Sequence, residues 1–443
     1  MIRCSRVWFS VLGSVCFPGG VGTAFSQSAM QPGAEPAEAQ PVPPEPEPRW
    51  WKGNLHTHTF WSDGNDFPEM VADWYRRHGY NFLAISDHNV MNEGERWMPA
   101  AEIEVRSRGS AFEKYLERFG KDWVETRGSR ENGDLEVRLK PMSEYRSLFE
   151  EAGRFLMIPA EEITGSAEDG NAIHMNATNL VELIEPQPGA TVSDAIRGNL
   201  RMAREQADRL GREILVHVNH PNFRWGVTPE DLAAVEEERF FEVWNGVDGD
   251  NDPGNAKRPS TDDMWDIANT LRLRDRRAAP LYGLATDDAH DYHLHSMRAM
   301  PGRAWIMVWA RHLTPESLIS AIRDGAFYAS TGVTYKRVEF DKQSGRLSLE
   351  IEPEDGETYV TRFIGTRRVG NSEKAEVGEV LARVEGTRAS FTLSGDEWYV
   401  RAVTTSDAAP DRPSRESLIK RAWTQPVGWK GWIQRDNMNG ERK

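Results

Sequence analysis

The chain has 443 residues, of which 39% are hydrophobic and 28% are charged, and its formal net charge is −15. This length is sufficient for one large enzyme domain and a smaller one, because domains usually contain about 100–250 residues. A chain this acidic is poorly suited to binding a phosphate backbone, so the composition argues against nucleic acid as a partner and favours a small-molecule substrate.

Residues 1–26 have the layout of a secretory signal peptide. Two arginines precede an apolar run over residues 7–25, and Ala24 and Ser26 stand at the −3 and −1 positions of a plausible cleavage point. Pro18 and two glycines interrupt the apolar run, whereas a membrane anchor needs about 20 continuous apolar residues. We therefore expect a periplasmic or secreted protein, with no integral membrane span after removal of the signal.

Both cysteines, Cys4 and Cys16, lie inside this segment, so the mature chain would have no disulfide and no thiol nucleophile. Residues 27–49 are rich in Pro and Glu and contain almost no large apolar side chain. Such a segment cannot bury enough surface to become ordered, which predicts an extended linker. The folded part is expected to begin near Trp50.

Short apolar runs alternate with helical patterns over residues 50–332, which indicates a parallel sheet, open or closed into a barrel. The predicted helices cover residues 68–78, 193–210 and 261–274, and Asp66 is the expected N-cap of the first. A charged insertion over residues 93–141 interrupts the alternation, and we interpret it as a lid. The predicted strands are 53–57, 82–86, 155–158, 173–178, 214–218, 240–244, 281–285 and 304–309.

The pattern changes in residues 333–443, where short alternating segments are separated by Gly, Asp and Pro. This arrangement is typical of a small antiparallel β domain. The strands expected there are 336–340, 346–351, 389–393 and 398–404.

Eight of the eleven histidines occur in tight clusters, most of them directly after a predicted strand. In a parallel β/α architecture the carboxyl ends of the strands open into one shared mouth. His56 and His58 can both face one metal ion, because alternate residues of a strand point to the same side, and Asp63 follows on the loop. Imidazole and carboxylate groups suit zinc, manganese or iron.

Five motifs in a fixed order, HTHTFWSDG, AISDHN, MIPAEEIT, NHPN and ATDDAH, resemble the polymerase and histidinol phosphatase (PHP) superfamily over about residues 50–330. The resemblance implies a distorted seven-stranded β/α barrel that carries two or three divalent transition-metal ions, namely zinc, manganese or iron. The C-terminal motifs FYASTGVTY, WYVRAVTTSD and AWTQPVGW are similar to an exported branch of the superfamily that includes carbaryl hydrolase.

The resemblance also implies roles for individual residues. The first metal would be bound by His56, His58 and Asp288, the second by His174 and His220, and the third by Asp63, His88 and His290. Glu162 matches the bridging carboxylate, whereas its neighbour Glu161 would face the other way. Several relatives have His where Asp63 stands, which leaves the occupancy of the third site open. The catalytic water would be held by Glu162, His58 and Asp288.

Other polar residues near these motifs are weaker candidates. Asp287 is an alternative ligand or a supporting residue, Asp87 could orient a ligand imidazole, and His217 is either a hydrogen-bond partner of a ligand or a core histidine. Three cations in the loops of the expected mouth could clamp an anionic substrate, although exposed cations are often only solvated: Lys257, Arg258 and Arg298.

These residues predict hydrolysis by a metal-bound hydroxide, with a phosphoester of a small molecule as the first expectation. A carbamate or carboxyl-ester hydrolase is the alternative, because the same hydroxide attacks a polarised carbonyl. A non-catalytic exported binding protein with a vestigial barrel is a third hypothesis. The sequence leaves the substrate, the metal and the oligomeric state open.

Overall fold

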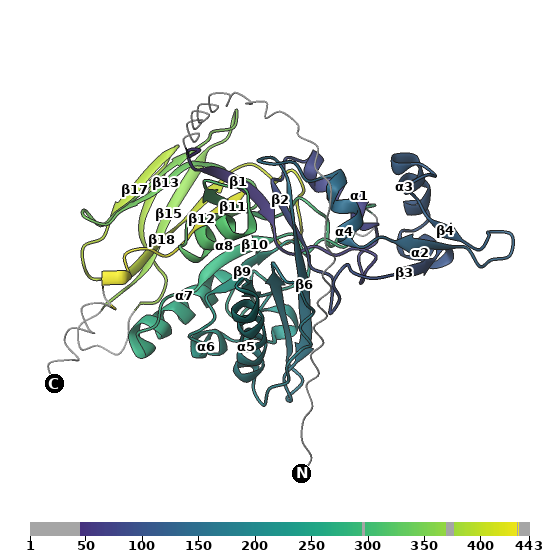
Figure 1. Ribbon diagram of the computed structural model, residues 1–443. Helices are drawn as coiled ribbons and strands as arrows, with labels where there is room; N and C mark the ends of the chain where they lie inside the picture. The colour runs from purple at the N-terminus through teal and green to yellow at the C-terminus, as the bar shows by residue number, and fades with distance from the viewer. Residues whose placement is uncertain (1–44, 295–296, 369–375, 432, 434–443) are drawn as a thin grey trace, which may run out of the picture. The chain divides into compact units, whose positions relative to one another are not determined.

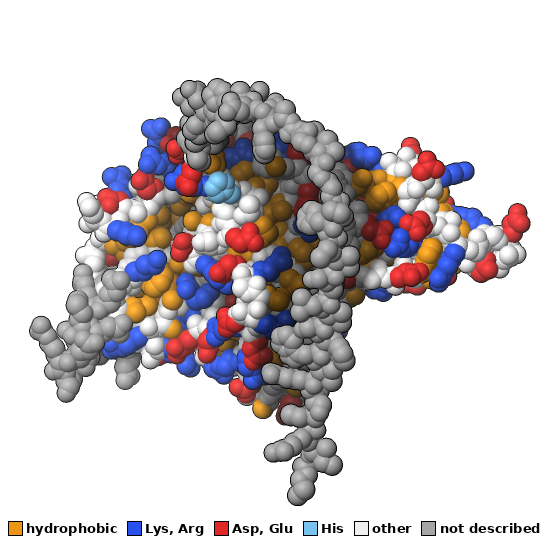
Figure 2. Space-filling view, in the orientation of Figure 1, with side chains coloured by type: hydrophobic (Ala, Val, Ile, Leu, Met, Phe, Trp, Pro, Cys, Tyr) orange, Lys and Arg blue, Asp and Glu red, His pale blue; other side chains and the backbone are white. Residues whose placement is uncertain are grey.

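The computed structural model describes residues 45–294, 297–368, 376–431 and 433 (Figure 1). The expected signal peptide, both cysteines and most of the expected linker lie outside the described residues. The described residues from 46 onward belong to one compact unit. Within the described ranges, no helix combines the length and the apolar character that a membrane span requires. Basic and acidic side chains are interspersed on the face shown in Figure 2.

The architecture is mixed α/β, with one large sheet and two small antiparallel sheets. In spatial order the large sheet contains β10 (Tyr282–Thr286), β9 (Phe240–Asn245), β8 (Leu215–Val218), β7 (Ala172–Thr178), β6 (Leu156–Ser166), β2 (Phe82–Ile85), β1 (Arg49–Asn54), β11 (Trp305–Ala310), β12 (Phe327–Ser330), β19 (Arg421–Thr424), β18 (Glu397–Ser406), β15 (Tyr359–Arg367) and β16 (Glu379–Glu385). The small sheets are β13 (Tyr335–Asp341), β14 (Arg346–Ile351) and β17 (Arg388–Thr392), and β3 (Arg96–Pro99), β5 (Glu136–Leu139) and β4 (Thr126–Arg127).

The helices are connectors between the strands, and several begin with a side-chain cap. They are α1 (Pro68–Arg77), α2 (Ala100–Arg106), α3 (Ala111–Phe119), α4 (Met142–Tyr145), α5 (Val192–Leu210), α6 (Pro229–Ala234), α7 (Thr261–Leu271) and α8 (Pro315–Arg323). The three predicted helices are confirmed as α1, α5 and α7. The prediction that Asp66 caps α1 was wrong: Phe67 is the N-cap residue, and the Asp66 carboxylate accepts a hydrogen bond from the amide of Phe67 itself.

The eight strands predicted before residue 332 are all present, but the first lies earlier than expected. It covers β1 (Arg49–Asn54) rather than residues 53–57, because residues 49–53 pair with the antiparallel strand β11. Gly53 allows β1 to lie close to β2, since a Cβ atom there would stand 2.1 Å from the ring of Phe82. The chain beyond Asn54 is thereby released to form the loop that carries the first histidines.

The prediction of a parallel sheet was wrong at β7 and at β11, which pairs antiparallel with β1. The pairs β1–β2, β2–β6, β8–β9 and β9–β10 are parallel, whereas β6–β7 and β7–β8 are antiparallel. The reason is the short link over residues 167–171, because a parallel connection needs about a dozen residues or more. An isolated parallel bridge between Thr57 and Ala289 joins the segments that follow β1 and β10, while closure of a barrel stays a prediction.

The insertion over residues 93–141 packs on the loop that carries Asp63. Phe67 from that loop stacks on Tyr115 of α3, with ring centroids 4.0 Å apart. Arg106 of α2 donates a hydrogen bond to the carbonyl of Gly64. The insertion therefore supports this loop from outside, and its function as a lid stays a prediction.

The four C-terminal strands predicted from the alternating pattern are confirmed as β13, β14, β17 and β18. Three further strands, β15, β16 and β19, continue the large sheet beyond β12. The buried side chain of Arg401 on β18 contacts α7 through two hydrogen bonds to Asp266. This ion pair joins the C-terminal strands to the first part of the chain.

Candidate metal centre

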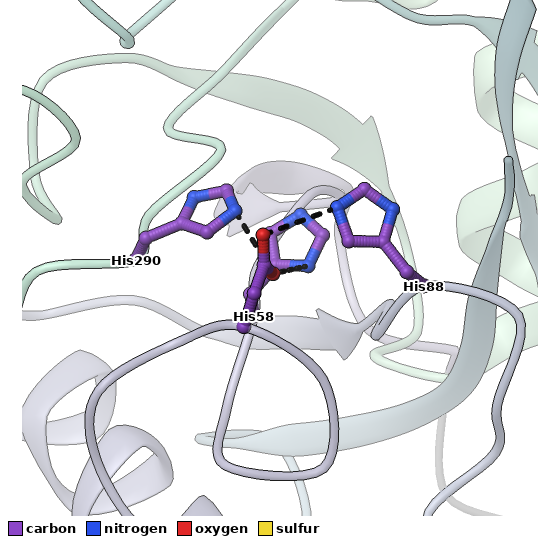
Figure 3. Close-up of side chains that lie close together, drawn as sticks. His58, His88 and His290 are labelled. Atoms are coloured by element: carbon purple, nitrogen blue, oxygen red, sulfur yellow. Dashed lines mark ion pairs between the residues drawn. The ribbon is translucent and has the colours of Figure 1, made fainter. Parts of the chain in front are cut away.

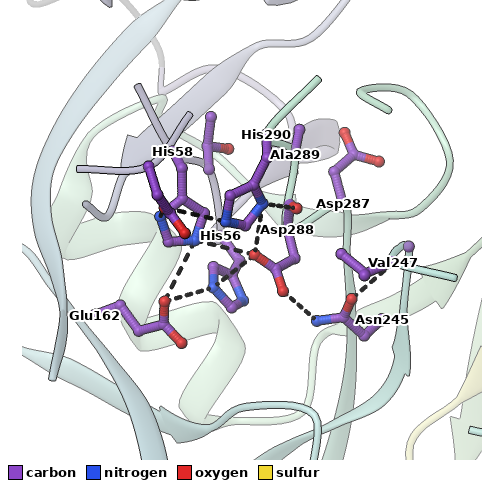
Figure 4. A network of polar contacts seen from close by, with 12 residues as sticks. His56, His58, Glu162, Asn245, Val247, Asp287, Asp288, Ala289 and His290 are labelled. Carbon is purple, nitrogen blue, oxygen red and sulfur yellow. Dashed lines mark hydrogen bonds and ion pairs between the residues drawn. The ribbon is translucent and has the colours of Figure 1, made fainter. Parts of the chain in front are cut away.

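All nine residues predicted as metal ligands belong to overlapping groups of side chains that could hold a metal ion. Figure 4 shows five of them: His56, His58, Glu162, Asp288 and His290. His56 and His58 follow β1, His88 follows β2, His220 follows β8, and Asp288 and His290 follow β10, whereas Glu162 lies within β6 and His174 within β7. The antiparallel direction of β7 matters here. Its start pairs with the end of β6, with His174 opposite Thr164, so this histidine reaches the same edge.

Four buried atoms converge at the centre of the region: Nε2 of His56, Nε2 of His58, Oε2 of Glu162 and Oδ1 of Asp288. The nitrogens lie 3.2–3.3 Å (His56) and 2.9–3.3 Å (His58) from the two oxygens. None of the four has a hydrogen-bond partner in the described structure. Ligands at about 2.0–2.2 Å from a tetrahedral metal ion stand roughly 3.4 Å apart, so this arrangement fits a divalent transition metal.

The carboxylate of Glu162 faces two sets of imidazoles. Its Oε2 is the central atom described above, and its Oε1 lies 3.0 Å from Nδ1 of His174 and 3.4 Å from Nε2 of His220. The side-chain amide of Asn219 donates a hydrogen bond of 2.9 Å to Oε1 and fixes its orientation. The two carboxylate oxygens of Glu162 therefore face different imidazoles, as the resemblance implies for a bridging carboxylate.

A third group of donors is more exposed to the solvent. In Figure 3 its two imidazoles, those of His88 and His290, lie on either side of His58. Asp63 Oδ1 lies 3.2 Å from Nε2 of His290, and its Oδ2 lies 3.6 Å from Nε2 of His88. His58 joins this group as well, since its Nδ1 is 3.6 Å from Asp63 Oδ1. The sequence analysis assigned His58 to the first site only. In the structure its Nε2 belongs to the central group, and its Nδ1 faces Asp63 of the third group. His88 is also shared, because its Nδ1 is 2.9 Å from Glu162 Oε2.

Burial and charge oppose each other strongly at this centre. Burial alone would lower the pKa of His56, but the carboxylates of Asp288, Glu162 and Glu242 raise it well above its usual value. Burial would likewise raise the pKa of Glu162, yet the imidazoles of His56, His88 and His174 hold it well below the usual range. The carboxylates thus require positive charge, which bound cations would supply in place of imidazole protons.

Two of the donor residues have left-handed backbone conformations that non-glycine residues rarely adopt. The φ angle is 21° at His220 and 47° at Asp288. The amide of Asp288 donates to the carbonyl of His56, which holds its segment against the first histidine loop. Such strained residues concentrate at functional sites.

Glu242 is the residue of this centre that the sequence analysis missed. It is fully buried on β9, and its Oε1 lies 2.8 Å from Nδ1 of His56. Oε1 also accepts from Thr286, and Oε2 accepts from the amide of His220 at 2.7 Å. The carboxylate therefore fixes the tautomer and ring orientation of His56 and leaves Nε2 free for a metal ion. The only sequence signal was a lone Glu in the otherwise apolar run FFEVW.

We expect Glu242→Gln to weaken metal binding about 10- to 100-fold while the secondary structure is preserved, because the amide cannot provide the negative charge that orients His56. Competition with a chelating dye measures the affinity. Glu238→Gln is the matched control, since Glu238 is also buried but accepts from the amides of Arg239 and Phe240. Wild-type metal affinity in Glu242→Gln would contradict this role.

The weaker candidates have supporting positions. The Asp287 carboxylate accepts from Asn54, Tyr75 and the backbone amides of residues 302–304, so it fixes the segment after β10. Asp87 holds the loop after His58 through Thr59 and Ser62. It reaches that imidazole through Ser62 Oγ, which donates to Asp87 and lies 3.3 Å from His58 Nδ1, in line with the predicted orienting role.

The remaining candidates lie around the centre. His217 is fully buried, with Nε2 3.4 Å from Glu242 Oε1, which places it in the interior rather than at the mouth. The three cations suggested for substrate binding, Lys257, Arg258 and Arg298, are all exposed. Arg298 donates to the carbonyl of Asp248. Their contribution to substrate binding stays a prediction.

No family model matches the chain, and no curated protein matches it. Several solved structures match it, and two of these share 14–15% identity with it. One, from Bacteroides vulgatus, is a two-domain protein containing a predicted PHP-like metal-dependent phosphoesterase; it has 15% identity, covers 89% of this chain and 100% of its own, and gives a TM-score of 0.37. The other is a candidate metal-dependent phosphoesterase from Bifidobacterium adolescentis, with 14% identity, coverage of 58% and 92%, and a TM-score of 0.28. These likenesses are too low to establish a family, so function must be inferred from the side chains of the centre.

Proposed function

We propose that the protein is a PHP-type metal-dependent hydrolase that acts on a phosphoester of a small molecule. The observation that carries this proposal is the convergence of buried, unpartnered nitrogen and oxygen atoms around Glu162, whose two carboxylate oxygens face different imidazoles. This donor set suits two or three zinc, manganese or iron ions. When bound, such ions would lower the pKa of water toward neutrality and stabilise charge on the oxygens of the substrate.

The exposure of the donors indicates the side from which the substrate enters. His56 and Glu162 are fully buried, whereas the side chains of Asp63, His88 and His290 are 58%, 26% and 24% exposed. The substrate would therefore meet the side of the centre that these three residues form. His56, His58 and Asp288 would hold the first ion, and His174 and His220 would bind the ion on the other oxygen of Glu162.

The alternatives concern chemistry that the same donors could support. A carbamate or carboxyl-ester hydrolase, as in the exported branch that the C-terminal motifs resemble, would use the same centre. A non-catalytic binding protein would not require so complete a donor set, which favours an enzyme. Export to the periplasm or beyond is part of the proposal and rests on residues 1–26.

We expect the purified protein to hold at least two transition-metal ions per chain after reconstitution with zinc, manganese or iron. Elemental analysis of the desalted protein measures this ratio. Less than one ion per chain with all three metals would contradict the metal centre itself.

A substrate panel then tests the reaction. We expect the metal-loaded protein to hydrolyse p-nitrophenyl phosphate or bis(p-nitrophenyl) phosphate faster than an aryl acetate or carbamate, and a chelator to abolish the activity. Turnover of the acetate or carbamate alone would replace the phosphoesterase proposal with the ester or carbamate alternative. A fully metallated protein without activity on the panel would favour the binding protein.

A further inference from the structure

A strained turn beside the metal centre carries an arginine that no motif had singled out. The turn η2 (Phe223–Trp225) follows His220 after two residues, and its backbone is left-handed at Arg224 and Trp225, with φ angles of 50° and 58°. The amide of Phe223 donates to the carbonyl of His220 at 2.8 Å, which closes the turn onto the candidate ligand. Consecutive non-glycine residues in this conformation are unfavourable and persist only where the surroundings hold them.

Contacts with neighbouring segments stabilise the conformation of this turn. Gly226 lies against the start of β7, where a Cβ atom would stand only 2.4 Å from the carbonyl oxygen of Ala172. The side-chain amide of Asn222 donates to the carbonyls of Asn251 and Pro259 at 3.0 and 3.1 Å. The turn is therefore fixed relative to His174 on the neighbouring strand.

Arg224 contacts the same aromatic ring, that of Phe223, as two candidate metal ligands do. The ring of Phe223 packs against the imidazoles of His220 and His174, with centroids 5.2 and 5.6 Å apart. The guanidinium carbon of Arg224 lies 5.3 Å from the centroid of the same phenyl ring. His174 lies beside the exposed His88, with ring centroids 5.7 Å apart, so a substrate that enters over His88 and extends to His174 and His220 would approach this positive charge.

Arg224 also lacks an acidic partner. The Arg224 side chain is exposed. Within the described ranges it forms no ion pair or hydrogen bond, and its guanidinium contacts the ring of Phe223. Several exposed arginines of this acidic chain are paired with carboxylates, as Arg130 is with Glu104 and Arg209 with Glu182. An unpaired guanidinium on a turn whose backbone is held in place is a suitable group for a planar, bidentate contact with phosphate oxygens.

We infer that Arg224, seated on Phe223, binds the non-bridging oxygens of the substrate's phosphate group. The site then selects dianionic phosphate monoesters over neutral esters and carbamates. The inference rests on the proposed function and adds the substrate class that this centre takes.

The test compares Arg224→Met with a matched control in the fully metallated protein. Arg108→Met is that control, because Arg108 is also exposed, lacks a recorded side-chain partner and has a φ angle of 52°, but lies in the insertion between α2 and α3. We expect Arg224→Met to lower kcat/KM for p-nitrophenyl phosphate about 10- to 100-fold and to leave metal content and hydrolysis of p-nitrophenyl acetate unchanged. Arg224→Lys should recover part of the loss, and Arg108→Met should resemble the wild type.

Calorimetry with inorganic phosphate separates this inference from the proposed reaction. We expect Arg224→Met to weaken the Kd of phosphate by a similar factor, whether or not phosphoesters are turned over. If the wild type hydrolyses no phosphoester but binds phosphate through Arg224, the proposed function fails and the anion subsite stands. Phosphate binding that is absent from the wild type or unchanged in Arg224→Met, or an equal loss on ester and phosphate substrates, would overturn the inference.

Discussion

Glu162→Gln is expected to reduce the hydrolytic activity about a thousandfold or more, a scale typical of losing a principal electrostatic contributor. The carboxylate of Glu162 faces His56 and His58 with one oxygen and His174 and His220 with the other. A neutral amide supplies no charge to either side and presents an N–H group to one of them. Metal content should fall with activity, while circular dichroism should remain that of the wild type.

The neighbouring residue is the matched control. Glu161 points away from the centre, and its Oε1 accepts a hydrogen bond of 2.7 Å from the amide of Ile184. Burial raises its pKa to about 8, so near pH 7 the carboxyl group is mostly protonated and a neutral amide replaces it with little change of charge. Glu161→Gln should therefore retain activity within about twofold and stability within about 1 kcal/mol.

The comparison separates two kinds of failure. Loss of metal in Glu161→Gln but not in Glu162→Gln would mean that the motif is displaced by one residue. Full metal binding and activity in both variants would mean that β6 contributes no ligand.

Arg401→Met should lower the free energy of unfolding by about 3–5 kcal/mol, because it would leave a buried carboxylate without its cation. Arg401 is 1% exposed and donates hydrogen bonds of 2.9 and 2.7 Å to the two oxygens of Asp266, with a third to Asp262 at 3.1 Å. Tyr399 donates to the same Asp266 oxygen but cannot neutralise its charge. Equilibrium unfolding in urea measures the difference.

A surface pair provides the control for this second prediction. Arg388 on β17 lies 3.3 Å from Glu350, but its side chain is 80% exposed. Arg388→Met should change the free energy of unfolding by less than about 1 kcal/mol, because water already screens this pair. If Arg401→Met were equally mild, the contact between α7 and β18 would not stabilise the fold as the geometry indicates.

The sequence predicted most of the strands and the helices α1, α5 and α7, because apolar runs and period-3.6 patterns are local signals. It failed where pairing partners decide the structure. The short link after β6 was the available signal for the antiparallel strand β7, and the alternation of strands and helices obscured it. β19 (Arg421–Thr424) has only four residues, and it is defined by pairing with β12 and β18 rather than by its own pattern.

The candidate ligands were accessible to sequence reasoning, since histidines and carboxylates cluster in short motifs. The residues that support these ligands could not be predicted in the same way. Glu242 is a single charged residue in an apolar strand, and its contact with His56 spans 186 positions of the chain. Tertiary contacts also determine the left-handed backbone at Asp288 and the turn that carries Arg224. No local sequence pattern predicts either of them.

The pairing of β1 with β11 sets the order in which this protein can assemble. Trp50 pairs with Trp309, so β1 cannot complete its pairing until a strand some 250 residues later in the chain has been synthesised. A growing chain that has just emerged past His290 already contains every candidate ligand, yet one edge of β1 has no neighbour. Contacts this distant slow folding and leave hydrophobic strand edges open to aggregation or to chaperones. We therefore expect the candidate metal centre to reach its final geometry only after β11 has been synthesised.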